Sequence, residues 1–271
     1  MSIIQQLEHK GVDGIRVGRF KAMINTSVIV YRVGDILIDC ACSNQWRFVK
    51  AFMEKHRIAR VLVTHHHEDH SGNGVFIRDE LKIPVLAPEK SLPYLAAGYP
   101  VHLYRRIIWG TPRNYLAEPL PEIVELDNHL TLHTLPTPGH SPDMNCFWIP
   151  ERGWLFTADL YISTHPQYCR EDESIAGEIE SLRHILDYDF KTVFCAHRGI
   201  VKNGREAIRE KLDYLESLRE EIQRLYREGK SIKEIRDTLL GKEKSVSWIS
   251  FFHFSKKNMI LSLLNEKEVI E

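Results

Sequence analysis

The sequence predicts a layered α/β fold, because short apolar, β-branched segments alternate with segments that have helical apolar spacing. Segments 59–64 (ARVLVT) and 192–196 (TVFCA) are typical of buried strands, whereas 43–57 and 174–188 repeat apolar residues every three or four positions. Interleaved strands and helices favour layers of both. With 271 residues, 43% of them apolar, the chain is long enough to bury a sizeable core in one large domain.

The N-terminal part begins with a predicted hairpin around a Val33-Gly34-Asp35 turn. Ser43 or Asn44 is placed to cap the helix that follows and runs to Arg57. The strands predicted in this part cover residues 27–32, 35–39, 59–64 and 84–87.

The C-terminal part has several short predicted strands within residues 123–159, a helix at 174–188 and a last strand at 192–196. Three helices then follow: an amphipathic one over residues 205–227, one capped by Ser231, and a single final helix over 246–264. We therefore expect a main domain of residues 1–202 and a helical C-terminal extension of residues 203–271.

The segment of residues 64–73, THHHEDHSGN, is the most informative stretch for function. It holds four side chains of metal-ligand type within six residues: His65, His67, Asp69 and His70. A strand that ends in a loop points alternate side chains the same way, so His65 and His67 can converge while His66 points elsewhere. Asp69 and His70 follow in a turn and can reach a different point. A lone histidine more often serves packing or the surface, but this pattern directly after a strand favours a metal site with two positions.

This segment resembles the T-H-x-H-x-D-H motif of the metallo-β-lactamase superfamily. Three further motifs of that superfamily occur in the expected order: Pro138-Gly139-His140-Ser141-Pro142, the strand WLFTADL ending at Asp159, and VFCAHRG with His197. The resemblance therefore extends over residues 64–199. It implies a four-layer αββα sandwich, with the C-terminal helices added to it.

The resemblance also implies a dinuclear metal centre. In that family pattern His65, His67 and His140 hold one metal, Asp69, His70 and His197 hold the other, and Asp159 bridges them. Imidazole and carboxylate ligands suit two divalent ions, with zinc as the first choice and iron or manganese as alternatives.

The implied activity is hydrolysis of a small ester-like substrate: a thioester, lactone, carboxylic ester or phosphodiester. A metal-bridging hydroxide is the expected nucleophile, and Asp69 is expected to orient it or relay its proton. Residues 139–144 (GHSPDM) lack the second Gly and His of glyoxalase II enzymes, and Tyr161 lies one position earlier than the tyrosine of acyl-homoserine lactonases. Two alternative functions therefore stay open. The protein is then either an iron-dependent oxidoreductase resembling persulfide dioxygenases or a binding and signalling module with little turnover.

Composition narrows the classes of binding partner and the cellular compartment that we expect. A formal net charge of −1 gives no basic surplus for nucleic acid, and no apolar run approaches the roughly 18 residues of a membrane span. Five scattered cysteines and an N-terminus without a secretory pattern favour a reducing, cytoplasmic location. We expect a small-molecule substrate, no nucleic acid or membrane partner, and a homodimer as a further candidate assembly.

Two segments are candidates for substrate contacts. Residues 99–118 interleave aromatic residues with arginines, which is consistent either with a packed connector or with a flap whose arginines meet an anionic group. The C-terminal helices offer aromatic residues that either line the pocket or dock the extension. The candidate substrate residues are Arg105, Arg106, Trp109, Arg113, Tyr161, Trp248, Phe252 and His253.

Overall fold

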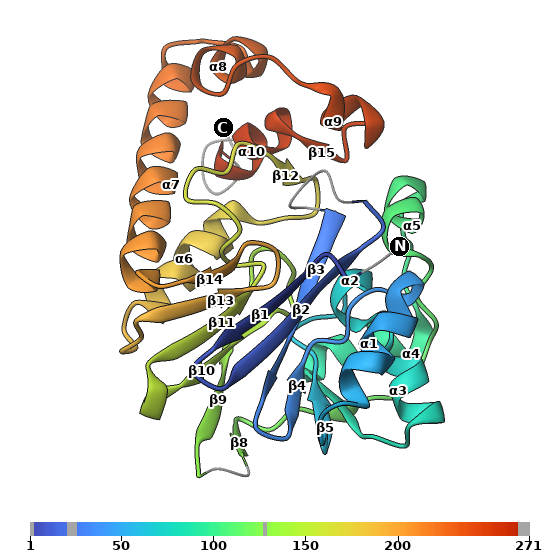
Figure 1. Ribbon diagram of the computed structural model, residues 1–271. Helices are drawn as coiled ribbons and strands as arrows, with labels where there is room; N and C mark the ends of the chain where they lie inside the picture. The colour runs from blue at the N-terminus through green and yellow to red at the C-terminus, as the bar shows by residue number, and fades with distance from the viewer. Residues whose placement is uncertain (1–2, 21–25, 127–128, 265–271) are drawn as a thin grey trace.

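The computed structural model describes residues 3–20, 26–126 and 129–264, and two β-sheets form its centre (Figure 1). The first sheet has the order β1-β2-β3-β4-β5-β6-β7: β1 Gln5–His9, β2 Val12–Gly18, β3 Ser27–Val33, β4 Ile36–Ile38, β5 Arg60–Leu62, β6 Val85–Ala87 and β7 Glu118–Pro119. The second has the order β14-β13-β11-β10-β9-β8: β8 Ile123–Glu125, β9 Thr131–Pro136, β10 Asn145–Ile149, β11 Trp154–Ala158, β13 Thr192–Cys195 and β14 Gly199–Val201.

Aromatic side chains join the two sheets. The rings of Phe156 and Phe194 stack with centroids 4.5 Å apart, and Tyr31 from the first sheet meets both edge-on. Such offset and edge-on contacts are favourable beyond the area they bury. The Tyr31 hydroxyl donates a 2.8 Å hydrogen bond to the Cys195 carbonyl oxygen, so the buried phenol is satisfied.

Helices cover both outer faces of the sheet pair, which confirms the expected four-layer αββα sandwich (Figure 1). Helices α1 (Trp46–Met53), α3 (Gly74–Glu80) and α4 (Leu92–Ala97) lie on the side of the first sheet. Helices α6 (Ile175–Ile185) and α7 (Gly204–Arg227) lie on the side of the second. The layers place the ends of β5, β11 and β13 at a common edge of the molecule.

Helix α1 is shorter than the sequence predicts and is not capped as expected. A 3-10 turn, η2 (Ser43–Gln45), precedes it, and the helix ends at Met53 rather than Arg57. The side chains of Ser43 and Asn44 donate hydrogen bonds to the carbonyl oxygens of Thr111 and Ile108 instead. A tertiary contact has therefore replaced the local cap.

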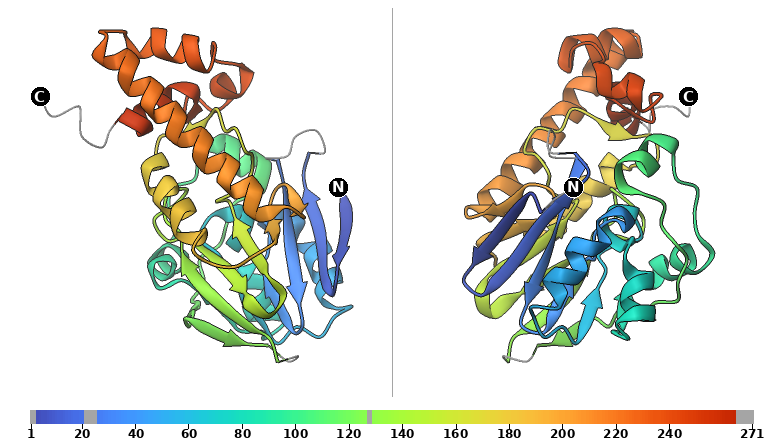
Figure 2. Two further views of the ribbon diagram at one scale, coloured as in Figure 1. Left: turned by 90° about the vertical axis from the view of Figure 1, so that its left-hand side faces the viewer. Right: turned by 45° about the vertical axis from the view of Figure 1, so that its right-hand side comes forward.

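The C-terminal extension contains α8 (Ile232–Leu239), α9 (Ser245–Ile249), β15 (Phe254–Ser255) and α10 (Lys256–Leu264). The prediction of one helix over residues 246–264 is wrong. The chain leaves α9 through Phe251 and Phe252, at φ of 54° and 62°, and β15 then pairs antiparallel with β12 (Cys169–Arg170). The long α7 carries the extension to one end of the sandwich (Figure 2). Within the described residues, no helix combines the length and hydropathy that a membrane span requires.

A buried ion pair joins the extension to the sandwich. Lys211 of α7 bonds to the carboxylate of Glu178 on α6 and donates a second, 2.7 Å hydrogen bond to the Leu160 carbonyl oxygen. The two side chains are only 4% and 7% exposed. Removing one partner would leave the other charge buried and uncompensated.

We expect Lys211→Met to lower the free energy of unfolding by about 3–5 kcal/mol, the usual cost of breaking a buried pair. Replacing both partners, as Lys211→Met with Glu178→Leu, should recover much of that loss because no charge is left unpaired. Urea unfolding of the three proteins measures this. Equal stability of the single and double variants would show that the pair contributes only through packing.

Candidate metal centre

Seven side chains of metal-ligand type meet where strands of both sheets end. His65 and His67 follow β5, and Asp69 and His70 lie on the one-turn helix α2 (Glu68–Ser71). His140 comes from the loop after β9, Asp159 follows β11, and His197 follows β13. All seven are buried, and they form two groups: His65, His67 and His140, and Asp69, His70, Asp159 and His197.

The first group presents three imidazole nitrogens to one point. His67 Nδ1 lies 2.8 Å from His65 Nε2 and 3.1 Å from His140 Nε2. Ligand nitrogens about 2.0–2.1 Å from a tetrahedral metal lie roughly 3.4 Å from one another, so the spacing is close to that of a site. Burial lowers the pKa of His65 and of His67 well below the usual range, which keeps both rings neutral and able to ligate.

The second group surrounds one carboxylate oxygen. Asp159 Oδ1 lies 3.3 Å from His70 Nε2 and 3.2 Å from His197 Nε2, and Asp69 Oδ2 lies 3.4 Å from the same His197 nitrogen. The other oxygen of Asp159 lies 3.1 Å from His140 Nε2 in the first group. Asp159 therefore touches both groups.

Neighbouring imidazoles lower the pKa of both carboxyls in the second group. Burial acts to raise the pKa of the Asp159 carboxyl, but the imidazoles of His197, His70 and His140 outweigh it and hold that pKa well below its usual range. The pKa of Asp69 is likewise lowered to about 2, against its burial, by His70 and His197. Both carboxyls are thus ionised at neutral pH.

Two buried atoms test whether divalent ions fit here. Among the described residues, His70 Nε2 and Asp159 Oδ1 are buried without a hydrogen-bond partner. Buried polar atoms are nearly always satisfied, and an imidazole nitrogen facing a carboxylate oxygen is the donor set of a divalent ion. The residues therefore fit metal binding.

The far ring nitrogens of the histidines contact further residues, of which only Thr64 belongs to the sequence motifs. His70 Nδ1 lies 2.7 Å from Asp39 Oδ2, His197 Nδ1 lies 2.7 Å from the Ser27 carbonyl oxygen, and His65 Nδ1 lies 3.1 Å from Thr64 Oγ1. Glu173 Oε1 lies 3.6 Å from His140 Nδ1. Such partners fix the ring and its tautomer in metal sites.

Strained backbone aims several of these groups. Ala158, directly before Asp159, has φ of 44°, and Asp39 has φ of 60°. Residues other than glycine rarely adopt this left-handed region, and strain of this kind concentrates at functional sites. Gly139, before His140, has φ of 141°, and a Cβ there would lie 2.5 Å from the Glu178 backbone nitrogen. A side chain at Gly139 would push His140 away.

His66 lies outside both groups. Its backbone and ring nitrogens contact the Asp143 carboxylate at 2.8–2.9 Å, and its ring stacks on Tyr94 with centroids 4.2 Å apart. Ser91 also donates to Asp143 at 2.6 Å. These contacts of His66 therefore hold the outer side of the loop that carries the candidate metal ligands.

A cavity of about 630 Å³ opens directly onto the two groups. Two candidate substrate residues, Arg105 and Trp109, belong to its lining. Arg105, however, is bound through two nitrogens to both oxygens of Glu68, at 2.6 and 2.9 Å. The lining also includes Arg170, which the sequence analysis missed because nothing in its local pattern distinguishes it. Arg170 donates a 2.7 Å hydrogen bond to the His140 carbonyl oxygen and pairs with Asp172 and Glu173.

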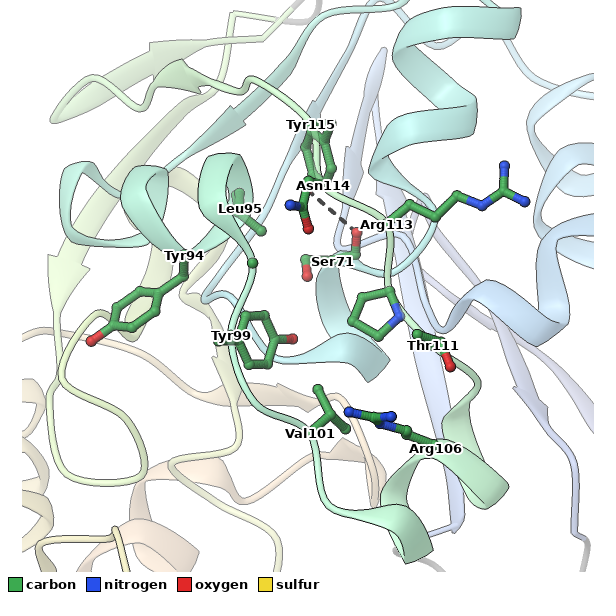
Figure 3. Close-up of a pocket in the computed structure, with 12 residues that line it drawn as sticks. Ser71, Tyr94, Leu95, Tyr99, Val101, Arg106, Thr111, Arg113, Asn114 and Tyr115 are labelled. Carbon is green, nitrogen blue, oxygen red and sulfur yellow. Dashed lines mark hydrogen bonds between the residues drawn. The ribbon is translucent and has the colours of Figure 1, made fainter.

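The other candidate substrate residues lie elsewhere. Arg106 and Arg113 belong to a separate pocket of about 70 Å³, and the guanidinium of Arg113 points away from its centre (Figure 3). The remaining four are not part of the lining of the large cavity: Tyr161, Trp248, Phe252 and His253. Trp248 is 65% exposed, whereas Tyr161 and His253 are buried.

The sequence model of the metallo-beta-lactamase superfamily matches residues 20–197, which is more than half of the chain. The chain therefore belongs to the metallo-β-lactamase superfamily. Solved structures agree on the fold: a β-lactamase domain protein from Burkholderia ambifaria (TM-score 0.74, 19% identity, 97% of this chain and 88% of that one) and a metallo-β-lactamase family protein from Thermus thermophilus (TM-score 0.69, 20% identity, 96% and 94%).

Curated relatives include hydrolases. A probable metallo-hydrolase of Bacillus subtilis, YybB, is 30% identical over 143 residues, which are 51% of this chain and 63% of that relative. The match thus spans less than two thirds of the relative's length. An atrochrysone carboxyl ACP thioesterase of Aspergillus fumigatus is 22% identical over 268 residues, which are 90% of this chain and 77% of the relative.

We expect His67→Ala to lose about one equivalent of bound metal and His66→Ala to retain the wild-type amount. The reason is that His67 contributes to the cluster while His66 faces Asp143, which Ser91 and the His66 backbone amide still satisfy. Inductively coupled plasma mass spectrometry on the purified proteins measures the difference. An equal loss in both variants would contradict the orientation of the metal loop.

Proposed function

We propose that this protein is a metal-dependent hydrolase of acyl esters, with thioesters as the foremost class. The observation that carries the proposal is the buried seven-residue cluster, with unsatisfied atoms on His70 and Asp159, at the floor of a large cavity. Membership of the superfamily and relatives named as a metallo-hydrolase and as thioesterases support it.

In this proposal His65, His67 and His140 hold one divalent ion, Asp69, His70 and His197 hold a second, and Asp159 contacts both. Zinc is the first choice because neutral imidazoles and carboxylates suit it. When bound, such ions polarise the substrate carbonyl and lower the pKa of water toward neutrality.

Asp69 is the residue that we propose for orienting the attacking water molecule. It lines the cavity, and because its pKa is lowered to about 2 its carboxylate is ionised at neutral pH and can accept a hydrogen bond from a water molecule. Its Oδ2 lies 3.4 Å from His197 Nε2, which fixes its direction. Asp69 is thus placed to orient a water molecule by accepting a hydrogen bond from it.

The electrostatics of the cavity favour an uncharged acyl portion. Three cations of the lining have carboxylate partners within the protein: Arg105 with Glu68, Arg170 with Asp172 and Glu173, and Lys211 with Glu178. Arg198, which is exposed, also belongs to the lining and has no ion pair with a carboxylate among the described residues. Apolar side chains complete much of the wall: Ile108, Trp109, Ile162, Ile175, Val246, Ile249, Phe254 and Met259. Paired charges and apolar walls are suited to an acyl chain, with the scissile carbonyl at the polar floor.

We expect the metal-loaded protein to hydrolyse acyl thioesters and carboxylic esters faster than bis-nitrophenyl phosphate. Chelation should abolish turnover, and added zinc or manganese should restore it. Asp159→Asn should lower kcat/KM by at least about 100-fold, beyond the roughly 10–100-fold cost of losing an outer partner of a metal site. Steady-state assays over this substrate panel provide the test. Turnover that survives chelation, or no turnover of any acyl substrate, would overturn the proposal.

The apolar wall formed by α9 yields a second expectation. Val246→Phe should raise KM for long-chain acyl thioesters by roughly tenfold while short-chain substrates change little, because small volume changes in apolar pockets are worth about 1–3 kcal/mol. Ile123→Phe, at a 53% exposed position on β8 outside the cavity, is the matched control. A uniform effect on all chain lengths would show that α9 does not contact the acyl chain.

A further inference from the structure

A second cluster of metal-ligand type lies outside the dinuclear centre, in the described part of the chain. Ligand atoms of His102, Glu171 and His253 lie within 4.8 Å of one another. The three residues come from three separate elements: His102 directly precedes α5 (Leu103–Trp109), Glu171 follows β12, and His253 precedes β15. None of the three belongs to the seven-residue centre.

The two imidazoles of this cluster are already closely associated. Their rings stack with centroids 3.8 Å apart and an interplanar angle of 27°, so the exposed His102 ring has to turn out of the stack for both imidazoles to face one ion. His253 is buried, and its Nδ1 lies 2.8 Å from the Tyr104 hydroxyl oxygen. This contact leaves Nε2 as the nitrogen that can face the cluster. A ligating histidine usually has its other ring nitrogen held by such a partner.

The local charges suit a cation. Burial, followed by the neighbouring His102, lowers the pKa of His253 to about 4, so its ring is neutral at pH 7. Neutral imidazole is the form that binds metals. Glu171 contributes a carboxylate, and the Asp172 carboxylate lies 3.7 Å from His253 Nε2.

We propose that His102, Glu171 and His253 form a third metal site, for a divalent ion of the zinc type. Two imidazoles and one carboxylate are a known donor set for this ion, with a fourth position left for water. Ligands of a tetrahedral zinc lie roughly 3.4 Å apart, so the cluster has to contract by about 1.4 Å at most. Since His102 and Glu171 are exposed, their side chains are able to make this movement.

The site lies between two walls of the large cavity. On one side, α5 contributes Tyr104, Arg105, Ile108 and Trp109 to the lining, and on the other, Ser250 and Phe254 flank His253. A metal held by His102 and His253 would cross-link α5 to the C-terminal extension. An ion bound there would fix the width of the cavity by joining these two walls.

The test compares four full-length proteins: wild type, His102→Ala, Glu171→Gln and the control His184→Ala, in which an exposed histidine of α6 is replaced. Each is equilibrated with zinc, and bound zinc is counted by inductively coupled plasma mass spectrometry. Isothermal titration calorimetry then measures the affinity of the last equivalent. We expect one more equivalent in wild type and in His184→Ala than in His102→Ala, and at least tenfold weaker binding of that equivalent in Glu171→Gln.

A thermal readout separates this site from the dinuclear centre. Zinc added to protein that already carries two metals should raise Tm in wild type and in His184→Ala but leave Tm of His102→Ala unchanged. Because His102 is exposed, its replacement does not disturb the core, and circular dichroism checks that the variant is folded. The proposal is overturned if all four proteins bind the same number of zinc ions, or if His184→Ala loses as much zinc as His102→Ala.

Discussion

The Asp159 carboxylate constrains the rest of this structure more than any other group. It is buried, and its two oxygens face nitrogens of His70 and His197 on one side and of His140 on the other. An ionised carboxylate in the interior costs several kcal/mol unless opposite charge or hydrogen bonds compensate it. Here the compensation comes from residues of both sheets. Packing the two sheets with their strand ends together brings His70 of the first sheet to Asp159, whereas His140 and His197 belong to the same sheet as Asp159.

The histidines around Asp159 are aimed by contacts that cross the same junction. His197 belongs to the second sheet, but its Nδ1 lies 2.7 Å from the Ser27 carbonyl oxygen of the first. Arg16 of β2 donates to the His197 carbonyl oxygen, and Ile29 donates to that of Ala196. The strained φ of Ala158 is held within this network. Formation of the metal cluster and packing of the sandwich are thus one process, and weakening either should loosen the other.

The candidate ligands could be predicted from sequence because each lies in a short motif directly after a strand, where local rules fix side-chain direction. Their supporting partners could not. Asp39 and Glu173 lie 31 and 33 positions from the histidines they hold, and no local pattern marks such a pair. The helix predicted over residues 246–264 failed for a related reason: helical periodicity is local, whereas β15 forms because it pairs with β12. Arg105 and Arg106 are neighbours in the sequence and had equal claims there. The fold shows that they line different pockets.

The C-terminal extension supplies part of the wall of the cavity above the candidate metal ligands. The cluster sits at the floor, while Val246, Ile249 and Phe254 of the extension supply apolar wall above it. Arg170 connects the floor of the cavity to this wall. Its guanidinium donates a hydrogen bond to the His140 carbonyl oxygen, and its backbone in β12 lies opposite Phe254 of β15. Asp172 and Glu173 pair with its guanidinium, so Arg170 adds no unpaired charge to the wall. Burial of apolar surface is the main favourable term that the apolar part of this wall can contribute, which supports the proposed acyl substrate.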